Sequence, residues 1–567
     1  MFAKKTFWGF GLLIFLFGIF LFLVMLSINY DDFINHLIQF GNVALSKKEK
    51  IEAIFTITRF KYLQYIIPIV ISIFGILILY YSQEISNFLK LVNRNLSRVV
   101  LFFRALSKGE KYLLFFIVVI SFLINLYHVI NLPIFYDEAW TYRNFTQRGL
   151  FISITKYPAP NNHVLHSILT NLSYYLPFST TINLRIPNLI TALFSSLLFF
   201  YTFAKMFEKR VAMLLLPIFC FVFGTLQYAY LSRGYMLVIF SFLICFYSTK
   251  KLTSQNENNY RKHLIYISVG GLLGFCTMPS FLYPYFTCIS YIVAYKIIKK
   301  DFRIIKYIVL SGIVTTILVL FFYTPIIIVS GLDAIINNKY VASITRLDVF
   351  ENLCNHFNET FGFLFGIKLI YLLPLLLFMI YYFIKKRTES SLFVAYCFLI
   401  APILLLVQSV IPFYRTWIYL IIPFIFSIGL ILSEITKNRK LNVQFVFVMN
   451  LLMSVVLVLF FNYKIKYEQE FSFQSSKIAN YVMSHNIKKI CCHHPIIETN
   501  LLYIFEVNKK KIAIEYSNKP LNRNQIKIIN QNYDLLITSQ KLEDSPDLFF
   551  INNWNSWEAN TYLYKTK

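Results

Sequence analysis

Two adjacent carboxylates stand directly after an apolar segment of the chain. Asp137 and Glu138 belong to the sequence Tyr-Asp-Glu-Ala-Trp at 136–140, which follows the uncharged stretch 113–132. A carboxylate near the hydrocarbon boundary of a membrane is costly unless it is hydrated, paired or used in chemistry. Such a group can act as a general base, orient a neighbouring base or bind a metal. We therefore expect the chemistry of this protein at Asp137 and Glu138.

Side chains that could bind a phosphate follow farther along the chain. His163 and His166 stand within Tyr-Pro-Ala-Pro-Asn-Asn-His-Val-Leu-His at 157–166, and Arg233 and Arg415 each stand near the end of an apolar segment. An arginine can hold a phosphate with two hydrogen bonds, and it does not lose its charge. These residues also have ordinary interpretations, since a histidine can cap a helix and an arginine can extend from a span to water.

The composition indicates where these residues must act. Of the 567 residues, 57% are hydrophobic and 14% are charged, a smaller charged share than soluble proteins carry. The apolar residues form blocks of about 20, the length of a helix that crosses a membrane. We predict an α-helical polytopic membrane protein with about thirteen transmembrane helices, at approximately 7–28, 62–81, 113–132, 187–204, 211–229, 233–249, 264–280, 281–297, 307–329, 367–384, 391–410, 413–433 and 443–462.

The net charge of +27 does not indicate a nucleic-acid partner, because its distribution is that of a protein in a lipid bilayer. Lys and Arg gather in short clusters between the apolar blocks, as is typical of cytoplasmic loops. With the N-terminus inside, these clusters are cytoplasmic, while the loop of Asp137, the loop 330–366 and the C-terminal tail lie outside. We predict a multi-pass protein of the plasma (bacterial inner) membrane, with its active site and C-terminal domain extracytoplasmic.

Three regions follow from this arrangement. The transmembrane core comprises residues 112–463. Two further transmembrane helices and a cytoplasmic loop precede it, at 1–111, and a small α/β domain follows it, at 464–567. The outer loop 131–185 has apolar residues at roughly helical spacing, which predicts one or two amphipathic helices on the outer membrane surface. The eight Cys have no paired spacing, so we expect neither disulfides nor a zinc site, and we interpret Cys-Cys-His-His at 491–494 as a strand end.

Several motifs occur in one order along the chain: Tyr-Asp-Glu-Ala-Trp at 136–140, the run at 157–166, Leu-Arg-Ile-Pro at 184–187, Ser-Arg-Gly-Tyr at 232–235, and Phe-Tyr-Arg at 413–415 followed by Pro423. This order resembles the type C glycosyltransferases, which use polyprenyl-phosphate sugars. The nearest branch is similar to bacterial relatives of the dolichyl-phosphate-mannose protein mannosyltransferases and to the aminoarabinose transferases of lipid A. The resemblance covers about residues 112–463. One departure is Asn-His-Val at 162–164, where the aminoarabinose branch has Lys-Pro-Pro.

The resemblance implies a fold, a reaction and a set of site residues. The fold is the type C glycosyltransferase architecture, and the reaction moves a sugar from a polyprenyl-phosphate donor to a hydroxyl of a glycan, lipid or protein acceptor. Asp137 is implied as the general base, and Glu138 as a residue that orients it, binds a metal or raises its pKa. Arg233, Arg415 and His163 are implied as contacts of the donor phosphate.

Lys156, His166 and Arg185 are additional candidates, although we interpret His166 as structural and Arg185 as an anchor between loop and span. No cofactor is firmly predicted, but a Mg or Mn ion could bind Asp137 and Glu138. A lipid phosphate is already a good leaving group, so one base and fixed cations suffice for the reaction. Direct displacement of this kind predicts inversion at the anomeric carbon.

Other functions are compatible with many spans: a transporter or flippase of lipid-linked sugars, a polymerase or ligase of lipid-linked glycans, and a non-enzymatic scaffold. Many transporters have repeated halves with functional charges at midplane, whereas this sequence has no evident repeat and carries its charges at span ends. A polymerase or ligase does not need an Asp-Glu pair in the first large outer loop. The presence of Asp137, Arg233 and Arg415 argues against a scaffold.

Overall fold

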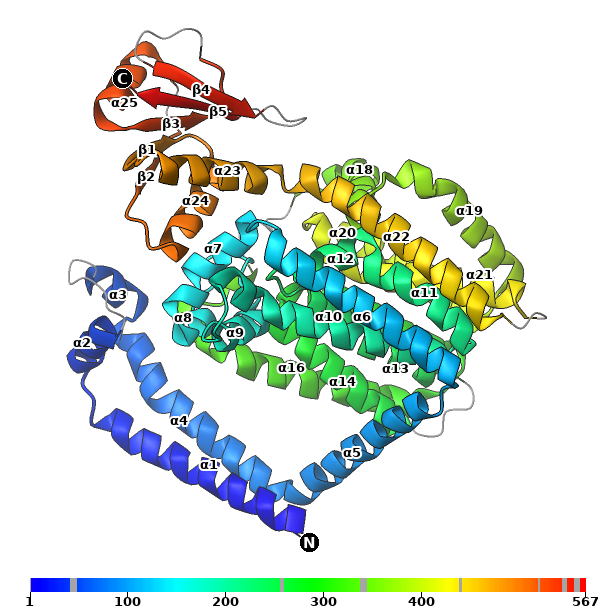
Figure 1. The fold of residues 1–567 in the computed structure, drawn as a ribbon. Coiled ribbons are helices and arrows are strands. Elements are labelled where there is room, and N and C mark those ends of the chain that lie inside the picture. Colours follow the sequence, from blue (N-terminus) through cyan, green and yellow to red (C-terminus); the bar gives the residue numbers. More distant parts are fainter. Residues whose placement is uncertain are drawn as a thin grey trace. The chain divides into compact units, whose positions relative to one another are not determined.

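The computed structural model describes residues 2–40, 48–254, 260–336, 344–437, 441–518, 521–542, 548–554 and 561–566. The chain forms two compact units (Figure 1). The first contains Met1–Leu114, Ile154–Pro160 and Leu320–Lys339, and the second contains Phe115–Ser153, Asn161–Val319 and Tyr340–Lys567.

The first unit is organised around two closely packed apolar helices, α1 (Phe2–Leu26) and α4 (Ile57–Tyr80). A glycine permits their close approach, because a Cβ added at Gly75 would lie 2.5 Å from the backbone nitrogen of Phe15. Small residues at such contacts let the backbones of membrane helices touch. The unit also contains α2 (Tyr30–Phe40), α3 (Lys48–Ile54), α5 (Ser82–Arg104) and α17 (Asp333–Ile336).

Long apolar helices make up most of the chain. Among the described residues, 11 helices are long and apolar enough to cross a membrane, or up to 12 if a bent pair counts as one span. The bent pair, α11 (Lys209–Phe221) and α12 (Phe223–Tyr230), has an angle of 62°. The other candidates are α1, α4, α6 (Lys108–Asn131), α10 (Thr180–Ala204), α13 (Tyr235–Thr253), η3 with α15 (Pro279–Ile298), α16 (Phe302–Ser330), α19 (Leu369–Lys386), α20 (Glu389–Gln408), η5 with α21 (Tyr414–Ile435) and α22 (Val443–Glu468).

The predicted fold class is confirmed, and the described residues contain 11 or 12 candidate spans where about thirteen were predicted. The predicted span 264–280 corresponds to α14 (Tyr260–Thr277), which carries Arg261, Lys262 and His263 in its first turn. These residues lower the mean hydropathy of α14, which is therefore not among the candidate spans, although its residues 264–277 carry no charge and match the predicted span. Another long helix that is not a candidate span, α18 (Arg346–Phe365), lies between the spans α16 and α19 in the chain.

The outer loop predicted at 131–185 contains three short helices instead of one or two: α7 (Tyr136–Asn144), α8 (Leu150–Thr155) and α9 (Val164–Ser173). The helix α9 also differs from the amphipathic surface helix that was predicted, because several of its polar side chains are buried. Its Asn171 amide, for example, donates to the Ser153 hydroxyl at 2.7 Å. A buried polar network with satisfied partners fixes one packing arrangement, which gives the loop a rigid base.

The C-terminal part of the second unit is an α/β domain, as predicted (Figure 1). Its five-stranded sheet has the order β2-β1-β3-β5-β4, in which β1 pairs in parallel with β2 and β3, and β5 pairs antiparallel with β3 and β4. The elements are α23 (Glu470–Ser484), β1 (Lys489–Cys492), α24 (Pro495–Val507), β2 (Ala513–Tyr516), α25 (Arg523–Asn532), β3 (Leu535–Thr538), β4 (Leu548–Trp554) and β5 (Thr561–Thr566).

The two cysteines of β1 point to opposite faces of this sheet. Cys492 lies in the apolar cluster that contains Ile478 and Leu501, whereas Cys491 lies in the cluster of Ile526 and Leu536. Consecutive side chains of a strand alternate between faces, so the two thiols cannot bind one metal together. The interpretation of this run as a strand end is confirmed.

Candidate active site

Asp137 and Glu138 occupy the first turn of α7, which follows α6 after the four residues 132–135. The backbone N–H of Phe135 donates to Glu138 Oε2 at 3.0 Å, so this carboxylate caps its own helix. A helix N-terminus favours negative charge, because its first N–H groups have no partner within the helix and point out of its N-terminal end. Both acids are buried, with exposed fractions of 7% for Asp137 and 1% for Glu138.

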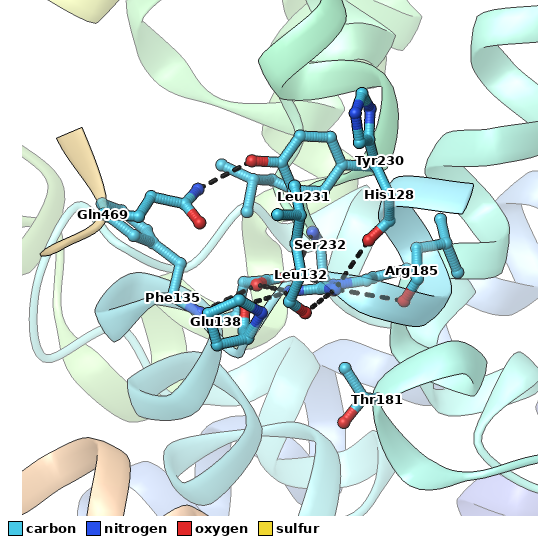
Figure 2. A network of polar contacts seen from close by, with 12 residues as sticks. His128, Leu132, Phe135, Glu138, Thr181, Arg185, Tyr230, Leu231, Ser232 and Gln469 are labelled. Atoms are coloured by element: carbon cyan, nitrogen blue, oxygen red, sulfur yellow. Dashed lines mark hydrogen bonds and ion pairs between the residues drawn. The ribbon is translucent and has the colours of Figure 1, made fainter. Parts of the chain in front are cut away.

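Glu138 forms a buried ion pair with Arg185 of α10 (Figure 2). Arg185 Nε donates to Oε1 at 3.0 Å and Nη2 donates to Oε2 at 2.7 Å, which makes the contact two-pronged. The backbone N–H of Ser232 also donates to Oε1, at 2.7 Å. Removing one partner of such a pair leaves an uncompensated buried charge, at a cost of about 3–5 kcal/mol. The sequence indicated Arg185 as an anchor but did not indicate its partner.

The other N–H groups of Arg185 bind the backbone at the end of α6 (Figure 2). Nη1 donates to the carbonyl oxygens of Val129 at 3.1 Å and Leu132 at 2.8 Å, and Nη2 donates to that of Pro133 at 2.8 Å. The guanidinium lies 5.5 Å from the ring centroid of Tyr230. We interpret Arg185 as a positioning residue that ties α10 to the first turn of α7.

Arginines contact both carboxylates that were expected as possible metal ligands. Both of its carboxylate oxygens accept hydrogen bonds from Arg185, and Asp137 Oδ2 accepts one from Arg415. Within the described ranges, no group of three or more His, Cys, Asp or Glu side chains could hold a metal. Because Mg²⁺ binds through free oxygen ligands, the option of Mg or Mn at Asp137 and Glu138 gains no support from this arrangement.

Asp137 pairs with a second arginine, Arg415 of η5 (Tyr414–Leu420), whose Nη1 donates to Asp137 Oδ2 at 2.7 Å. Burial raises the pKa of Asp137, but the charges of Arg415 and Arg233 and the hydrogen bond from Arg415 outweigh it. The pKa therefore lies below its ordinary value of 3.8. Glu138 has its own partner in Arg185, and the option that Glu138 raises the pKa of Asp137 stays a prediction from the sequence.

Arg233, in the turn between α12 and α13, is held by two segments of the loop 131–185. Its Nη1 donates to the Thr141 hydroxyl at 2.8 Å and to the Asn161 carbonyl at 3.1 Å, and its Nη2 donates to the Asn161 side-chain oxygen. Thr141 lies one helical turn after Asp137 on the same face of α7. Arg233 and Asp137 are thereby brought close enough for the charge of one to affect the pKa of the other.

His163 is also part of this cluster, and its contact with a donor phosphate stays a prediction. Its Nδ1 accepts a hydrogen bond from the Gly234 backbone N–H at 2.7 Å, and its Nε2 lies 3.2 Å from Arg233 Nη2. Burial and the charge of Arg233 hold the pKa of His163 well below 6.5, so the ring is neutral. Because Nδ1 is an acceptor, the proton of the neutral ring lies on Nε2 and points towards the Arg233 donor.

The cluster therefore contains donors in excess of acceptors. The Nε2–H of His163 faces another donor, and in the part of the chain that the structure describes the buried Nε atoms of Arg233 and Arg415 have no hydrogen-bond partner. An unpartnered buried donor costs about 1–3 kcal/mol. A bound anion with several acceptor oxygens, such as a phosphate, would satisfy these groups.

The remaining candidates are placed differently. His166 is buried in α9, and burial together with the charge of Arg233 lowers its pKa to about 3, which fits a neutral side chain. Lys156 belongs to the first unit, whereas the cluster belongs to the second. The role of Lys156 stays a prediction from the sequence.

Two residues that sequence reasoning missed support the cluster. The Asn188 amide donates to the carbonyls of Tyr228 at 3.0 Å, Leu231 and Arg233 at 2.7 Å, and so fixes the turn that carries Arg233. His356 Nε2 accepts from Trp417 Nε1 at 2.8 Å and steadies η5, two residues after Arg415. An asparagine inside an apolar span is a recognisable signal, but the contact between positions 356 and 417 is not visible in the sequence.

The fold of the chain is similar to that of solved membrane enzymes. The structure of ArnT from Cupriavidus metallidurans bound to undecaprenyl phosphate matches with a TM-score of 0.54 and 9% identity, covering 81% of this chain and 98% of that one. ArnT in the apo state matches with a TM-score of 0.52 and 10% identity, covering 79% and 97%. No family model and no curated protein sequence matches. ArnT is a lipid A aminoarabinose transferase, so the expected type C glycosyltransferase architecture is confirmed at the level of the fold.

Proposed function

We propose that this chain, which has the type C glycosyltransferase fold, is a membrane glycosyltransferase that moves a sugar from a polyprenyl phosphate to an acceptor hydroxyl. The observation that carries the proposal is the cluster in which Asp137 lies beside the buried Arg233 and the half-buried Arg415, whose Nε donors have no partner among the described residues. The cluster offers one carboxylate and several fixed cationic or N–H groups, and the reaction needs this combination. The undecaprenyl phosphate bound to ArnT supports a polyprenyl phosphate as the donor class.

In the proposed reaction, the acceptor oxygen forms a bond to the anomeric carbon while the bond from that carbon to the phosphate oxygen breaks. Asp137 accepts the proton of the acceptor hydroxyl, and the polyprenyl phosphate leaves with the bonding electrons. Arg233, Arg415 and the Nε2–H of His163 stabilise the negative charge that grows on the phosphate. Attack opposite to the leaving group inverts the configuration of the anomeric carbon.

The Asp137 carboxylate is suited to this role by its partners. Arg415 occupies Oδ2, while among the described residues Oδ1 has no hydrogen bond, so that it is left for an acceptor hydroxyl. The lowered pKa keeps the group ionised at neutral pH. The same shift makes Asp137 a weak base, so it accepts the proton only as the new carbon–oxygen bond forms and the hydroxyl becomes acidic.

The site would work on the outer face of the plasma (bacterial inner) membrane, with the C-terminal domain on the same side. This orientation rests on the short basic loops, which fall on the opposite side from the loop of Asp137. The acceptor would be a glycan, a lipid or a protein that reaches the outer leaflet.

The test combines a deletion strain with the purified protein. Glycan profiling of the deletion strain should reveal one sugar lost from one envelope component, and complementation with Asp137→Asn should fail to restore it. Purified protein should then move that sugar from its polyprenyl phosphate to the acceptor. If the wild-type protein in proteoliposomes carries the lipid-linked sugar across the bilayer without transferring it, the proposal is wrong and the protein is a flippase.

A further inference from the structure

The helix α7 is too short to keep its own position. It has nine residues, and isolated helices shorter than about 12–15 residues are marginal in water. Its first turn is fixed by the pair of Glu138 and Arg185, and its Thr141 contacts Arg233. The opposite end of α7, with Tyr142 and Arg143, packs against another element, the helix α24 of the C-terminal domain.

Tyr503 of α24 makes the central contact. Its side chain is 2% exposed and belongs to an apolar cluster with Ala139 and Tyr142 of α7 and Leu184 of α10. Its ring centroid lies 5.1 Å from that of Tyr142, at an interplanar angle of 82°. Edge-to-face pairs of this kind contribute about 0.5–1.5 kcal/mol beyond the burial of their area.

The hydroxyl of Tyr503 reaches a different helix. It lies 2.9 Å from the Thr181 hydroxyl, in the first turn of α10. Thr181 stands four residues before Arg185, so the two side chains share one face of α10. Tyr503 therefore joins the end of α7 to the helix whose arginine holds the beginning of α7.

Two further contacts come from residues that precede and follow Tyr503 in the chain, Gln469 and Glu506. Arg143 Nε lies 3.1 Å from Glu506, an ion pair that is about one third exposed and so of small energy. Gln469, which precedes α23, donates from Nε2 to the Tyr230 hydroxyl at 2.7 Å, and the Tyr230 ring contacts the Arg185 guanidinium (Figure 2). The C-terminal domain is thus attached at two places, and each leads to the buried pair at Glu138.

We infer that the C-terminal domain positions α7, the helix that carries Asp137, and that Tyr503 is the main positioning residue. The inference rests on the proposed function, because it assigns to the domain the task of keeping Asp137 in line with the donor and acceptor. A displacement of about 1 Å can cost a hundredfold in rate when reacting groups lose alignment. The effect should fall on turnover, since Tyr503 does not belong to the cluster around the phosphate contacts.

The test is Tyr503→Ala in the full-length protein, with Tyr503→Phe as the conservative variant. We expect kcat to fall about tenfold to a hundredfold in Tyr503→Ala, with little change in the KM for the donor. Tyr503→Phe retains the ring contact with Tyr142 and should recover most of kcat. The matched control is Ile526→Ala, which weakens an apolar cluster of the domain that does not contain Tyr503. If Ile526→Ala lowers kcat as much, or if Tyr503→Ala leaves kcat unchanged, the inference is wrong.

A second measurement does not depend on activity. Hydrogen–deuterium exchange should become faster at the α7 amides of Tyr503→Ala, while the amides of α9 should keep the wild-type rate. If the wild-type protein has no transferase activity, the proposed function fails, and the exchange experiment still decides whether α24 holds α7. Unchanged exchange in α7 would overturn the positioning role even in an active enzyme.

Discussion

Arg415 Nη1 lies 2.7 Å from Asp137 Oδ2, across 278 positions of the chain, and this contact governs the proton affinity of the proposed base. Burial alone would raise the pKa of Asp137, whereas the two arginines lower it below 3.8. The carboxylate is therefore ionised throughout the neutral range. Its protonation begins only when the pH falls through the lowered pKa.

The pH dependence of turnover should reflect this balance. If the ionised form of Asp137 is the active one, kcat at saturating donor should not decrease between pH 8 and pH 5 on account of this group. The Arg415→Gln variant loses the positive charge that lowers the pKa of Asp137, whereas burial still raises this pKa. The acidic limb of kcat should therefore move to higher pH. The measurement is kcat against pH for both proteins. An acidic limb at the same pH in both would show that Arg415 does not set the pKa of the base.

The Asp137→Asn variant should lose turnover but should still fold. The amide retains an oxygen that can accept from Arg415, so we expect normal expression and donor binding, with a loss of about a hundredfold to ten-thousandfold in kcat. Asp301→Asn is a suitable control, because Asp301 is a partly exposed acid that pairs with Lys296 at 3.2 Å. Turnover of Asp137→Asn within a few-fold of wild type would exclude Asp137 as the base.

Glu138→Gln should act on stability. It removes a charge that is fully buried against Arg185, and breaking such a pair costs about 3–5 kcal/mol. The apparent Tm should fall, and the double variant Glu138→Gln with Arg185→Met should recover part of the loss, because no unpaired charge then remains. A single variant with wild-type Tm and low activity would instead assign Glu138 to the chemistry.

Much of the architecture could be predicted because periodicity and hydropathy are local properties. The apolar blocks predicted the spans, and the alternating segments beyond position 463 predicted the strands β1, β2 and β3. The short helices of the loop 131–185 were harder to predict. They are held by buried polar contacts, such as that of Asn171 with Ser153, which a pattern of apolar residues does not reveal.

The sequence indicated which residues form the cluster, but it did not indicate which of them pair with one another. The sequence motifs indicated Asp137, Arg233, Arg415 and His163, and the structure brings these four together. That each carboxylate has its own arginine depends on how α7, α10 and η5 pack. Such contacts between distant positions follow from the tertiary structure, so the different environments of two adjacent acids could not be read from their neighbours in the chain.

The orientation of the chain can be tested by cysteine accessibility. Of the eight cysteines, Cys354 is exposed and the other seven are buried, so Cys354→Ser provides a nearly silent background. Cysteines introduced at Lys156 and Asn530 should react with a membrane-impermeant reagent from outside, and one at Lys385 should react only after permeabilisation. Reaction at position 385 in intact cells would invert the predicted topology and place Asp137 inside.

Replacing Arg233 or Arg415 with lysine should weaken binding of the donor. A planar guanidinium can hold two phosphate oxygens at once, whereas an ammonium provides a point charge. We expect Arg233→Lys and Arg415→Lys each to raise the KM for the polyprenyl-phosphate sugar more than the KM for the acceptor.

The loss should be larger for Arg233, because its Nη atoms also hold Asn161 and Thr141 and so fix the loop above the site. Donor titration at saturating acceptor is the measurement, and Arg148→Lys is the control, since Arg148 is an exposed arginine of the same loop. If both variants respond to the donor as the wild type does, the two arginines serve the packing of α7, and the donor phosphate binds elsewhere.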